Sequence, residues 1–135
     1  DPTRKVSRQF FGTDGRPISE ARIANVLEQV RLDDIPRVLK SYPHELSGGM
    51  AQRVAIAMAI EHEPRLIIAD EPTSALDASV RLQILDLLKE ISIRSGAALI
   101  IVSHDLKAVR SYCERVAVMY AGRIVELGDS KGDFN

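Results

Sequence analysis

The sequence predicts an α/β domain in which a parallel sheet follows a mostly helical N-terminal part. Residues 65–70 and 97–104 each contain a continuous apolar run that ends on polar residues, which is typical of parallel strands covered on both faces. Residues 77–96 lie between these runs and return to helical spacing, with Gly96 as a stop. This alternation of strand and helix indicates a parallel sheet. Residues 115–128 predict two further strands around a tight Ala-Gly turn.

The N-terminal part, residues 1–43, is predicted to consist of short helices and polar loops. Apolar residues within 18–32 follow helical spacing, and Ser19 is suited to cap that helix. Residues 48–62 are rich in alanine and methionine and are apolar on most of the helix circumference. This composition predicts a helix that packs on several sides and ends before Pro64.

The composition fits one soluble globular domain. Of the 135 residues, 45% are apolar and 27% are charged, which excludes a disordered or fibrous chain. A formal net charge of −1 gives no electrostatic case for nucleic acid or an anionic membrane as the main partner. No apolar run approaches the roughly 20 residues of a membrane span. The single cysteine excludes an internal disulfide framework.

A serine and two glycines stand at the start of the predicted helix 48–62. Ser47 is a good N-cap, and Gly48 and Gly49 would let a ligand approach the bare backbone amides at the positive end of the helix. This arrangement predicts an anion site. The alternative is an ordinary serine-capped helix, which explains Ser47 but not two glycines that each cost up to about 1 kcal/mol against alanine.

Polar residues follow each predicted strand at the edge where ligands bind in open α/β sheets. They are Asp70 and Glu71 after the first strand and Ser103 and His104 after the second. Burying adjacent carboxylates is costly unless a cation compensates, so Mg²⁺ with a phosphate ligand is the economical explanation. The aspartate would hold the metal, and the glutamate would orient or deprotonate a water. Two alternatives stay open: the carboxylates cap the next segment, and His104 is an ordinary surface residue.

Three strings together resemble the ATPase subunits of ABC transporters. They are LSGGMAQR at 46–53, LIIADEPTSALD at 66–77 and IIVSHD at 100–105, in this order and at these separations. Within that family, residues 42–50 and 116–126 are most similar to the oligopeptide, dipeptide and nickel uptake branch.

The resemblance implies a partial RecA-like P-loop NTPase core, a parallel sheet with helices, plus a helical signature subdomain. Residues 1–62 would be the helical subdomain and residues 63–135 the C-terminal part of the core. In this family two subunits close head to tail on two ATP molecules. Each signature motif then faces the nucleotide held by the other subunit.

The resemblance also assigns roles to individual positions. The signature motif would be Leu46, Ser47, Gly48, Gly49, Met50 and Gln52. The D-loop would be Ser74, Ala75, Leu76 and Asp77. Asp70 would be the Walker B aspartate that holds Mg²⁺ through water, Glu71 the general base, and His104 the switch histidine that reaches the γ-phosphate.

The chain lacks two elements that the family uses to bind ATP. None of its eight glycines begins a G-x-x-x-x-G-K-[ST] string, so there is no P-loop. The Q-loop glutamine is also absent, because residues 1–10 resemble the segment just after it, and we expect the chain to be part of a longer subunit. A helix N-terminus offers an anion at most about 2 kcal/mol, whereas micromolar affinity needs roughly 8 kcal/mol. The chain alone is therefore predicted neither to bind ATP tightly nor to hydrolyse it.

The missing P-loop strand has a consequence for the sheet. The family places that strand between the strands predicted at 97–104 and 115–120. Without it, two apolar edges would stay unpaired, so we expect a rearranged sheet, a swapped oligomer or aggregation of the isolated chain.

The resulting prediction is an ATP-binding and hydrolysing subunit of an importer of peptides or similar small solutes. It implies ATP and Mg²⁺ as cofactors. The implied partners are a second ATPase subunit (identical or different) and transmembrane permease subunits. The implied location is a peripheral position on the cytoplasmic face of the inner or plasma membrane. The permease partners would read the transported substrate. One alternative is a soluble ABC-type ATPase acting on DNA or ribosomes, which the absence of a basic stripe disfavours. Another is a non-catalytic binding module.

Overall fold

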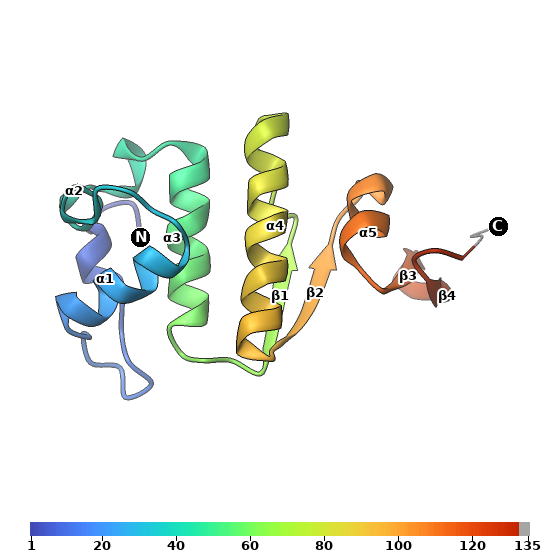
Figure 1. Ribbon diagram of the computed structural model, residues 1–135, viewed down its shortest axis with the longest axis horizontal. Helices are drawn as coiled ribbons and strands as arrows, with labels where there is room; N and C mark the ends of the chain where they lie inside the picture. Colours follow the sequence, from blue (N-terminus) through green and yellow to red (C-terminus); the bar gives the residue numbers. More distant parts are fainter. Residues whose placement is uncertain (133–135) are drawn as a thin grey trace.

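Helices and strands follow one another in the predicted order. The computed structural model describes residues 1–132 (Figure 1). Its elements are two 3₁₀ turns at Val6–Arg8 and Pro43–Glu45, helices α1 (Glu20–Gln29), α2 (Ile35–Lys40), α3 (Gly48–Ile60), α4 (Ala78–Ser95) and α5 (Leu106–Tyr112), and strands β1 (Leu66–Asp70), β2 (Ala98–Val102), β3 (Arg115–Tyr120) and β4 (Arg123–Asp129).

The predicted helix boundaries are confirmed by their caps. The Ser19 hydroxyl accepts a hydrogen bond from the Arg22 backbone N–H at 3.3 Å and so caps α1. Ser47 caps α3 in the same way, with the Met50 N–H 3.3 Å from its Oγ. Gly96 ends α4 with a φ of +69°, in the left-handed region that favours glycine.

The strands form two separate sheets. β1 and β2 pair in parallel, with Leu66 opposite Ala98 and Asp70 opposite Val102, so both strands end at the same level. β3 and β4 form an antiparallel hairpin of their own. Its turn residues Ala121 and Gly122 have φ of +48° and +77°, as a tight two-residue hairpin turn requires. The predicted parallel pair and hairpin are confirmed, and the hairpin does not join the parallel sheet.

The prediction that both faces of the parallel strands are covered is wrong for this chain. β1 buries Ile67 and Ala69, but the alternate residue Ile68 is 63% exposed. On β2, Ile100 and Val102 are each 48% exposed. Among the described residues, α4 packs on one face of this sheet and no helix covers the other (Figure 1). The apolar runs therefore predict the positions of β1 and β2 correctly, but the second face of these two strands is exposed in this polypeptide.

One hydrophobic core joins α1, α2, α3, α4 and β1. Its largest fully buried side chains are Ile23, Leu27, Ile84, Leu87, Leu88 and Ile91. Residues on both sides of position 62 contribute to this core, so the two predicted subdomains share it here. No residue of α5, β3 or β4 belongs to this cluster.

Candidate functional site

The ends of four elements meet at one end of the molecule. α3 and α4 both begin there, and β1 and β2 both end there, at the top of Figure 1. The residues predicted as signature motif, Walker B acids, D-loop and switch histidine all lie at or next to these four ends. The backbone therefore places together the groups that the sequence holds in three separate strings.

The glycines at the start of α3 lie against the D-loop and the start of α4. A Cβ added to Gly49 would lie 2.7 Å from Val80 Cγ1, which real structures essentially never allow. A Cβ on Gly48 would lie 3.2 Å from Leu76 Cδ2. From the sequence, a ligand was the expected reason for these glycines. The structure adds an internal reason, because only a bare backbone lets α3 approach α4 this closely.

The rest of the predicted signature motif divides into buried and exposed positions. Leu46 and Met50 are partly buried and pack on the core, whereas Ser47 and Gly48 are exposed. Gln52 is half-buried. The motif thus leaves its capping hydroxyl and its first helical residue open to solvent at the helix end.

Glu71 and His104 form a direct pair across the ends of β1 and β2. The Glu71 carboxylate oxygen Oε1 lies 2.7 Å from His104 Nδ1 and accepts the His104 backbone N–H at 3.2 Å. Glu71 itself bonds through its N–H to the Val102 carbonyl at 2.9 Å. The His104 side chain is 84% exposed and that of Glu71 is 35% exposed. The proposed base and the proposed switch histidine therefore touch each other and face solvent.

Glu71 occupies an unusual backbone conformation. Its φ is +45°, which side-chain-bearing residues seldom adopt. The turn lets the chain leave β1 sharply, and Ser74 N–H donates to the Glu71 carbonyl at 3.2 Å. Sparsely populated backbone conformations cluster at functional sites, where surrounding contacts hold them in place.

Asp70, at the end of β1, has an exposed side chain. Within residues 1–132 no group of three or more His, Cys, Asp or Glu side chains gathers in a way that could hold a metal. A single accessible carboxylate fits a Mg²⁺ held largely by water and phosphate oxygens, which is the usual mode for this ion. The sequence argument assumed that these adjacent carboxylates are buried, and the exposed Asp70 shows that this assumption is wrong. The assignment of Asp70 to Mg²⁺ stays a prediction.

The segment predicted as the D-loop connects Glu71 to α4. Ser74 and Ala75 are exposed, Leu76 packs on the core, and Asp77 caps α4. The Asp77 carboxylate accepts hydrogen bonds from the backbone of Val80 at 3.0 Å and from Ser79 at 3.1 Å. The Val80 N–H first, and then the Ser79 hydroxyl, which donates to the same oxygen at 2.7 Å, lower the pKa of Asp77 below its ordinary value.

Three charged residues near the site escaped the sequence argument. Arg53, in the first string, donates to the Val30 carbonyl at 2.8 Å and to Gln83 at 3.0 Å, and burial lowers its pKa. Arg81 lies on α4, and Asp105 caps α5 by accepting the Lys107 and Ala108 N–H groups. The partners of Arg53 and the Arg81–Asp105 ion pair are far apart in sequence, so spacing carries no signal for these contacts. The capping role of Asp105 is local and is a signal that the sequence did offer.

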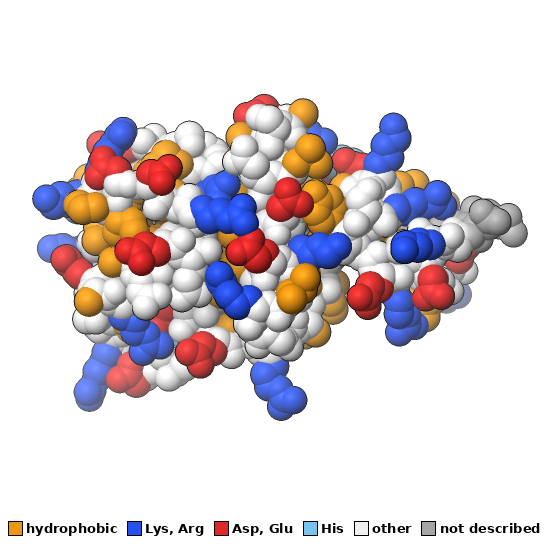
Figure 2. All heavy atoms as spheres, viewed as in Figure 1, with side chains coloured by type: hydrophobic (Ala, Val, Ile, Leu, Met, Phe, Trp, Pro, Cys, Tyr) orange, Lys and Arg blue, Asp and Glu red, His pale blue; other side chains and the backbone are white. Residues whose placement is uncertain are grey.

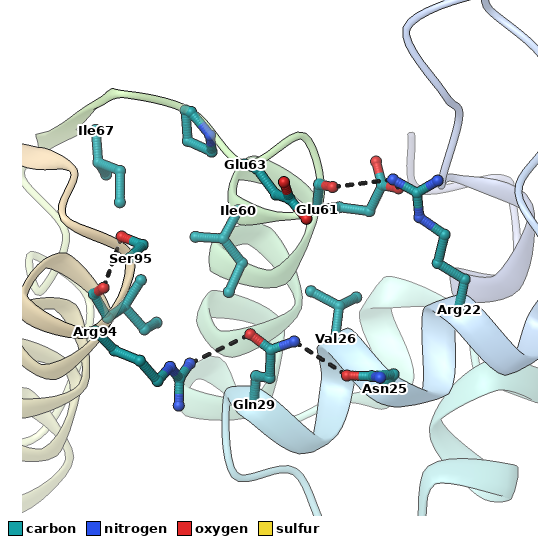
Figure 3. Close-up of a pocket in the computed structure, with 12 residues that line it drawn as sticks. Arg22, Asn25, Val26, Gln29, Ile60, Glu61, Glu63, Ile67, Arg94 and Ser95 are labelled. Atoms are coloured by element: carbon teal, nitrogen blue, oxygen red, sulfur yellow. Dashed lines mark hydrogen bonds and ion pairs between the residues drawn. The ribbon is translucent and has the colours of Figure 1, made fainter.

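A hollow of about 630 Å³ lies at the opposite ends of α3 and α4 (Figure 3). It contains none of the predicted site residues. On its wall the Glu61 carboxylate is 2% exposed and lies 2.7 Å from Arg22 Nη2 and 3.1 Å from His62 Nδ1. Neither Glu61 oxygen accepts a well-angled hydrogen bond. Arg22 already supplies a cation to the buried carboxylate. On the face shown in Figure 2, acidic and basic side chains are interspersed.

The sequence profile of the ABC transporter family matches residues 1–74 of the chain. The chain belongs to the ABC transporter family. Curated relatives of this ABC transporter chain include the "probable D,D-dipeptide transport ATP-binding protein DdpD" of Escherichia coli. It is 46% identical over an alignment 134 residues long, which covers 95% of this chain and 41% of the relative. The oligopeptide transport ATP-binding protein OppD of Lactococcus lactis is 53% identical over 79% of this chain and 32% of its own length. The chain thus spans less than half the length of these relatives.

Solved structures support the same family. The ATP-binding cassette MJ0796, a dimer in a post-hydrolysis state bound to ADP and Pi, superposes with a TM-score of 0.75 at 28% identity, over 98% of this chain and 60% of that one. The predicted fold class, a partial RecA-like core with a helical part, is therefore confirmed. Within the described residues of this ABC transporter chain, no helix is both long and apolar enough to cross a membrane.

Proposed function

We propose that this chain is the part of an ATP-hydrolysing importer subunit that supplies the signature motif, the catalytic glutamate and the switch histidine. The observation that carries the proposal is the Glu71–His104 pair at the ends of β1 and β2, with Oε1 and Nδ1 2.7 Å apart. In the whole subunit, residues 1–62 would act as the helical subdomain and residues 63–135 as the C-terminal part of the ATPase core.

Glu71 would act as the general base. Its carboxylate is partly exposed, so it can accept a proton from a water at the strand ends. His104 donates its backbone N–H to the same carboxylate, which restricts the rotation of the Glu71 side chain. The exposed histidine ring then has a second nitrogen, Nε2, free to turn toward a phosphate oxygen. Mg²⁺ near Asp70 would supply charge neutralisation for the phosphates when bound.

The start of α3 would serve a nucleotide held by a second ATPase subunit. Exposed Ser47 and Gly48 stand at the positive end of a thirteen-residue helix, where an anion is favoured. Because the chain has no P-loop of its own, we expect the isolated chain to bind Mg-ATP with a Kd weaker than micromolar, as checked by calorimetry.

The cargo class is inferred from the relatives. Those described above are named as transport ATP-binding proteins for a D,D-dipeptide and for oligopeptides. We infer a peptide or similar small solute as the cargo, permease subunits as the membrane partners, and a peripheral position on the cytoplasmic side of the membrane. The cargo would contact the permeases rather than this chain.

The test is the Glu71→Gln variant of the full-length subunit. We expect ATP turnover to fall by about 10² to 10⁴-fold, since a general base contributes that much, while ATP binding stays within a few-fold. Glu63→Gln is a matched control, because Glu63 is an exposed glutamate with a similar φ of +49° but lies in the distant hollow. Near-normal turnover in Glu71→Gln would overturn the proposed role. His104→Ala should also cripple hydrolysis in a phosphate-release assay.

A further inference from the structure

Arg81 joins two loops that come from different strands. It lies in the first turns of α4, and its backbone N–H donates to the Asp77 carbonyl at 2.9 Å. Its side chain reaches back, so that Nη2 lies 3.4 Å from the Leu76 carbonyl oxygen in the segment proposed as the D-loop. Nη1 lies 3.6 Å from Asp105 Oδ2, in the loop that follows β2. One guanidinium therefore contacts both loops that flank the Glu71–His104 pair.

The two oxygens of the Asp105 carboxylate make different interactions. Its Oδ1 accepts the Lys107 and Ala108 N–H groups, each at 3.1 Å, and caps α5, while Oδ2 faces Arg81. The Asp105 backbone N–H donates to Ser103 Oγ at 3.1 Å, which closes the loop around His104. Any shift of Asp105 toward or away from Arg81 would carry the neighbouring His104 with it.

The geometry suits positioning better than stabilisation. The side chains of Arg81 and Asp105 are 39% and 32% exposed, and half-exposed ion pairs add little to stability. Nε of Arg81 is buried without a hydrogen-bond partner in the described residues, so the guanidinium is held in place despite an unsatisfied donor. A planar fork that spans a carbonyl and a carboxylate cannot be reproduced by a single ammonium group.

We propose that Arg81 is a positioning residue for ATP hydrolysis, which ties the D-loop to the loop 103–105 and so holds His104 against Glu71. The inference rests on the proposed function for its kinetic consequence. It also makes a structural statement that is independent of turnover, namely that the environment of the His104 ring depends on Arg81.

The kinetic test uses the full-length subunit with the Arg81→Gln and Arg81→Lys variants. We expect Arg81→Gln to lower kcat by about 10 to 100-fold, the loss typical of a small misplacement of catalytic groups, while KM for ATP stays within about threefold. Arg81→Lys should fall between this variant and wild type. Arg94→Gln is the matched control, because Arg94 is a half-exposed, ion-paired arginine at the other end of α4. A kcat for Arg81→Gln within twofold of wild type would overturn the proposal.

A double-mutant cycle with Asp105→Asn separates positioning from general damage. Asparagine keeps an oxygen to cap α5 but removes the charge that faces Arg81. If Arg81 acts through Asp105, the double variant should turn over ATP at the same rate as the slower single variant. Multiplying effects would contradict this connection.

Side-chain ¹⁵N spectra of histidine-labelled full-length subunit provide the readout that does not need hydrolysis. His104 is assigned by the signal lost in His104→Gln. We expect Arg81→Gln, but not Arg94→Gln, to shift the His104 ring signals. An unchanged His104 spectrum refutes the positioning role even if turnover falls. If Arg81→Gln shifts the His104 signals but the wild-type subunit hydrolyses no ATP, the positioning role is supported and the proposed function is refuted.

Discussion

The packed half of the molecule and its C-terminal hairpin are stabilised in different ways. The helices α1 to α4 and strand β1 share one core of buried aliphatic side chains. The β3–β4 hairpin is stabilised mainly by its own ladder, and five of its large apolar or aromatic side chains are more than half exposed: Met119, Tyr120, Ile124, Val125 and Leu127. The difference shows that the helical part buries most of its large apolar side chains in one core, whereas the hairpin and the open face of β1–β2 leave theirs exposed.

The largest expected effect concerns the association state of the 135-residue polypeptide. Its open sheet faces and unpaired strand edges should lead it to self-associate, because such edges template pairing with other chains. Light scattering should report a mass above that of the 14.9 kDa monomer, increasing with concentration. Ile68→Lys together with Val125→Lys should shift the chain toward the monomer. A clean monomer without these substitutions would contradict the expectation.

Substitutions in the two regions should differ strongly in their effect on stability. Leu87 on α4 is fully buried, so Leu87→Ala should lower the free energy of unfolding by about 2 to 5 kcal/mol. Leu127 on β4 is 58% exposed, and Leu127→Ala should cost less than about 0.5 kcal/mol. Urea unfolding followed by circular dichroism measures both. Equal losses would show that the hairpin belongs to the same packed unit.

The contact between α3 and α4 offers a sharper test inside the packed half. Gly49→Ala places a Cβ 2.7 Å from Val80 Cγ1, and such overpacking costs about 1 to 3 kcal/mol, offset by up to about 1 kcal/mol of helix propensity. Gly48→Ala meets the flexible end of Leu76 at 3.2 Å and the Ala75 carbonyl oxygen at an ordinary 4.0 Å, and should be nearly neutral. Thermal unfolding of the two variants compares them directly. If Gly48→Ala is the more damaging, the close approach of the helices does not explain Gly49.

The smallest expected effect is the pH dependence from Asp77. Hydrogen bonds from Val80 and Ser79 lower its folded-state pKa below 3.8, its ordinary value. The stabilisation is therefore fully present above the unfolded-state pKa and is lost as the pH falls through the folded-state value. Asp77→Asn should flatten the decrease in Tm on acidification below about pH 4. An unchanged acid limb in Asp77→Asn would argue against this cap as a source of acid sensitivity.

Helix caps and strand positions could be predicted from the sequence, whereas the uncovered second face of the sheet could not. Ser19 and Ser47 predict their helix starts and Gly96 its helix end, because capping depends on neighbouring residues alone. Apolar periodicity locates the strands for the same reason. It cannot tell whether a second layer is present, so the exposure of Ile68 and Ile100 was missed.

The candidate site also has features that the sequence predicts and features that only the folded structure shows. Two of the three strings single out Asp70, Glu71 and His104, and the ends of parallel strands bring these residues to one edge of the sheet. The contact of Gly49 with Val80 and the bridge made by Arg81 depend on how two helices and two loops approach one another. No spacing within the sequence encodes those distances, and they appear only once the chain is folded. The roles assigned to the individual site residues stay predictions.

The register of the two parallel strands sets how much length variation this protein tolerates. Asp70 lies opposite Val102, and this alignment is what brings His104 within reach of Glu71. Inserting one residue into β2 would move His104 about 3.3 Å along the sheet and turn its neighbours to the opposite face. The same insertion in the loop between α1 and α2 would leave the β1–β2 register and the Glu71–His104 contact unchanged. Variation in chain length should therefore be confined to the connections of the helical part, while the spacing from β2 to His104 stays fixed.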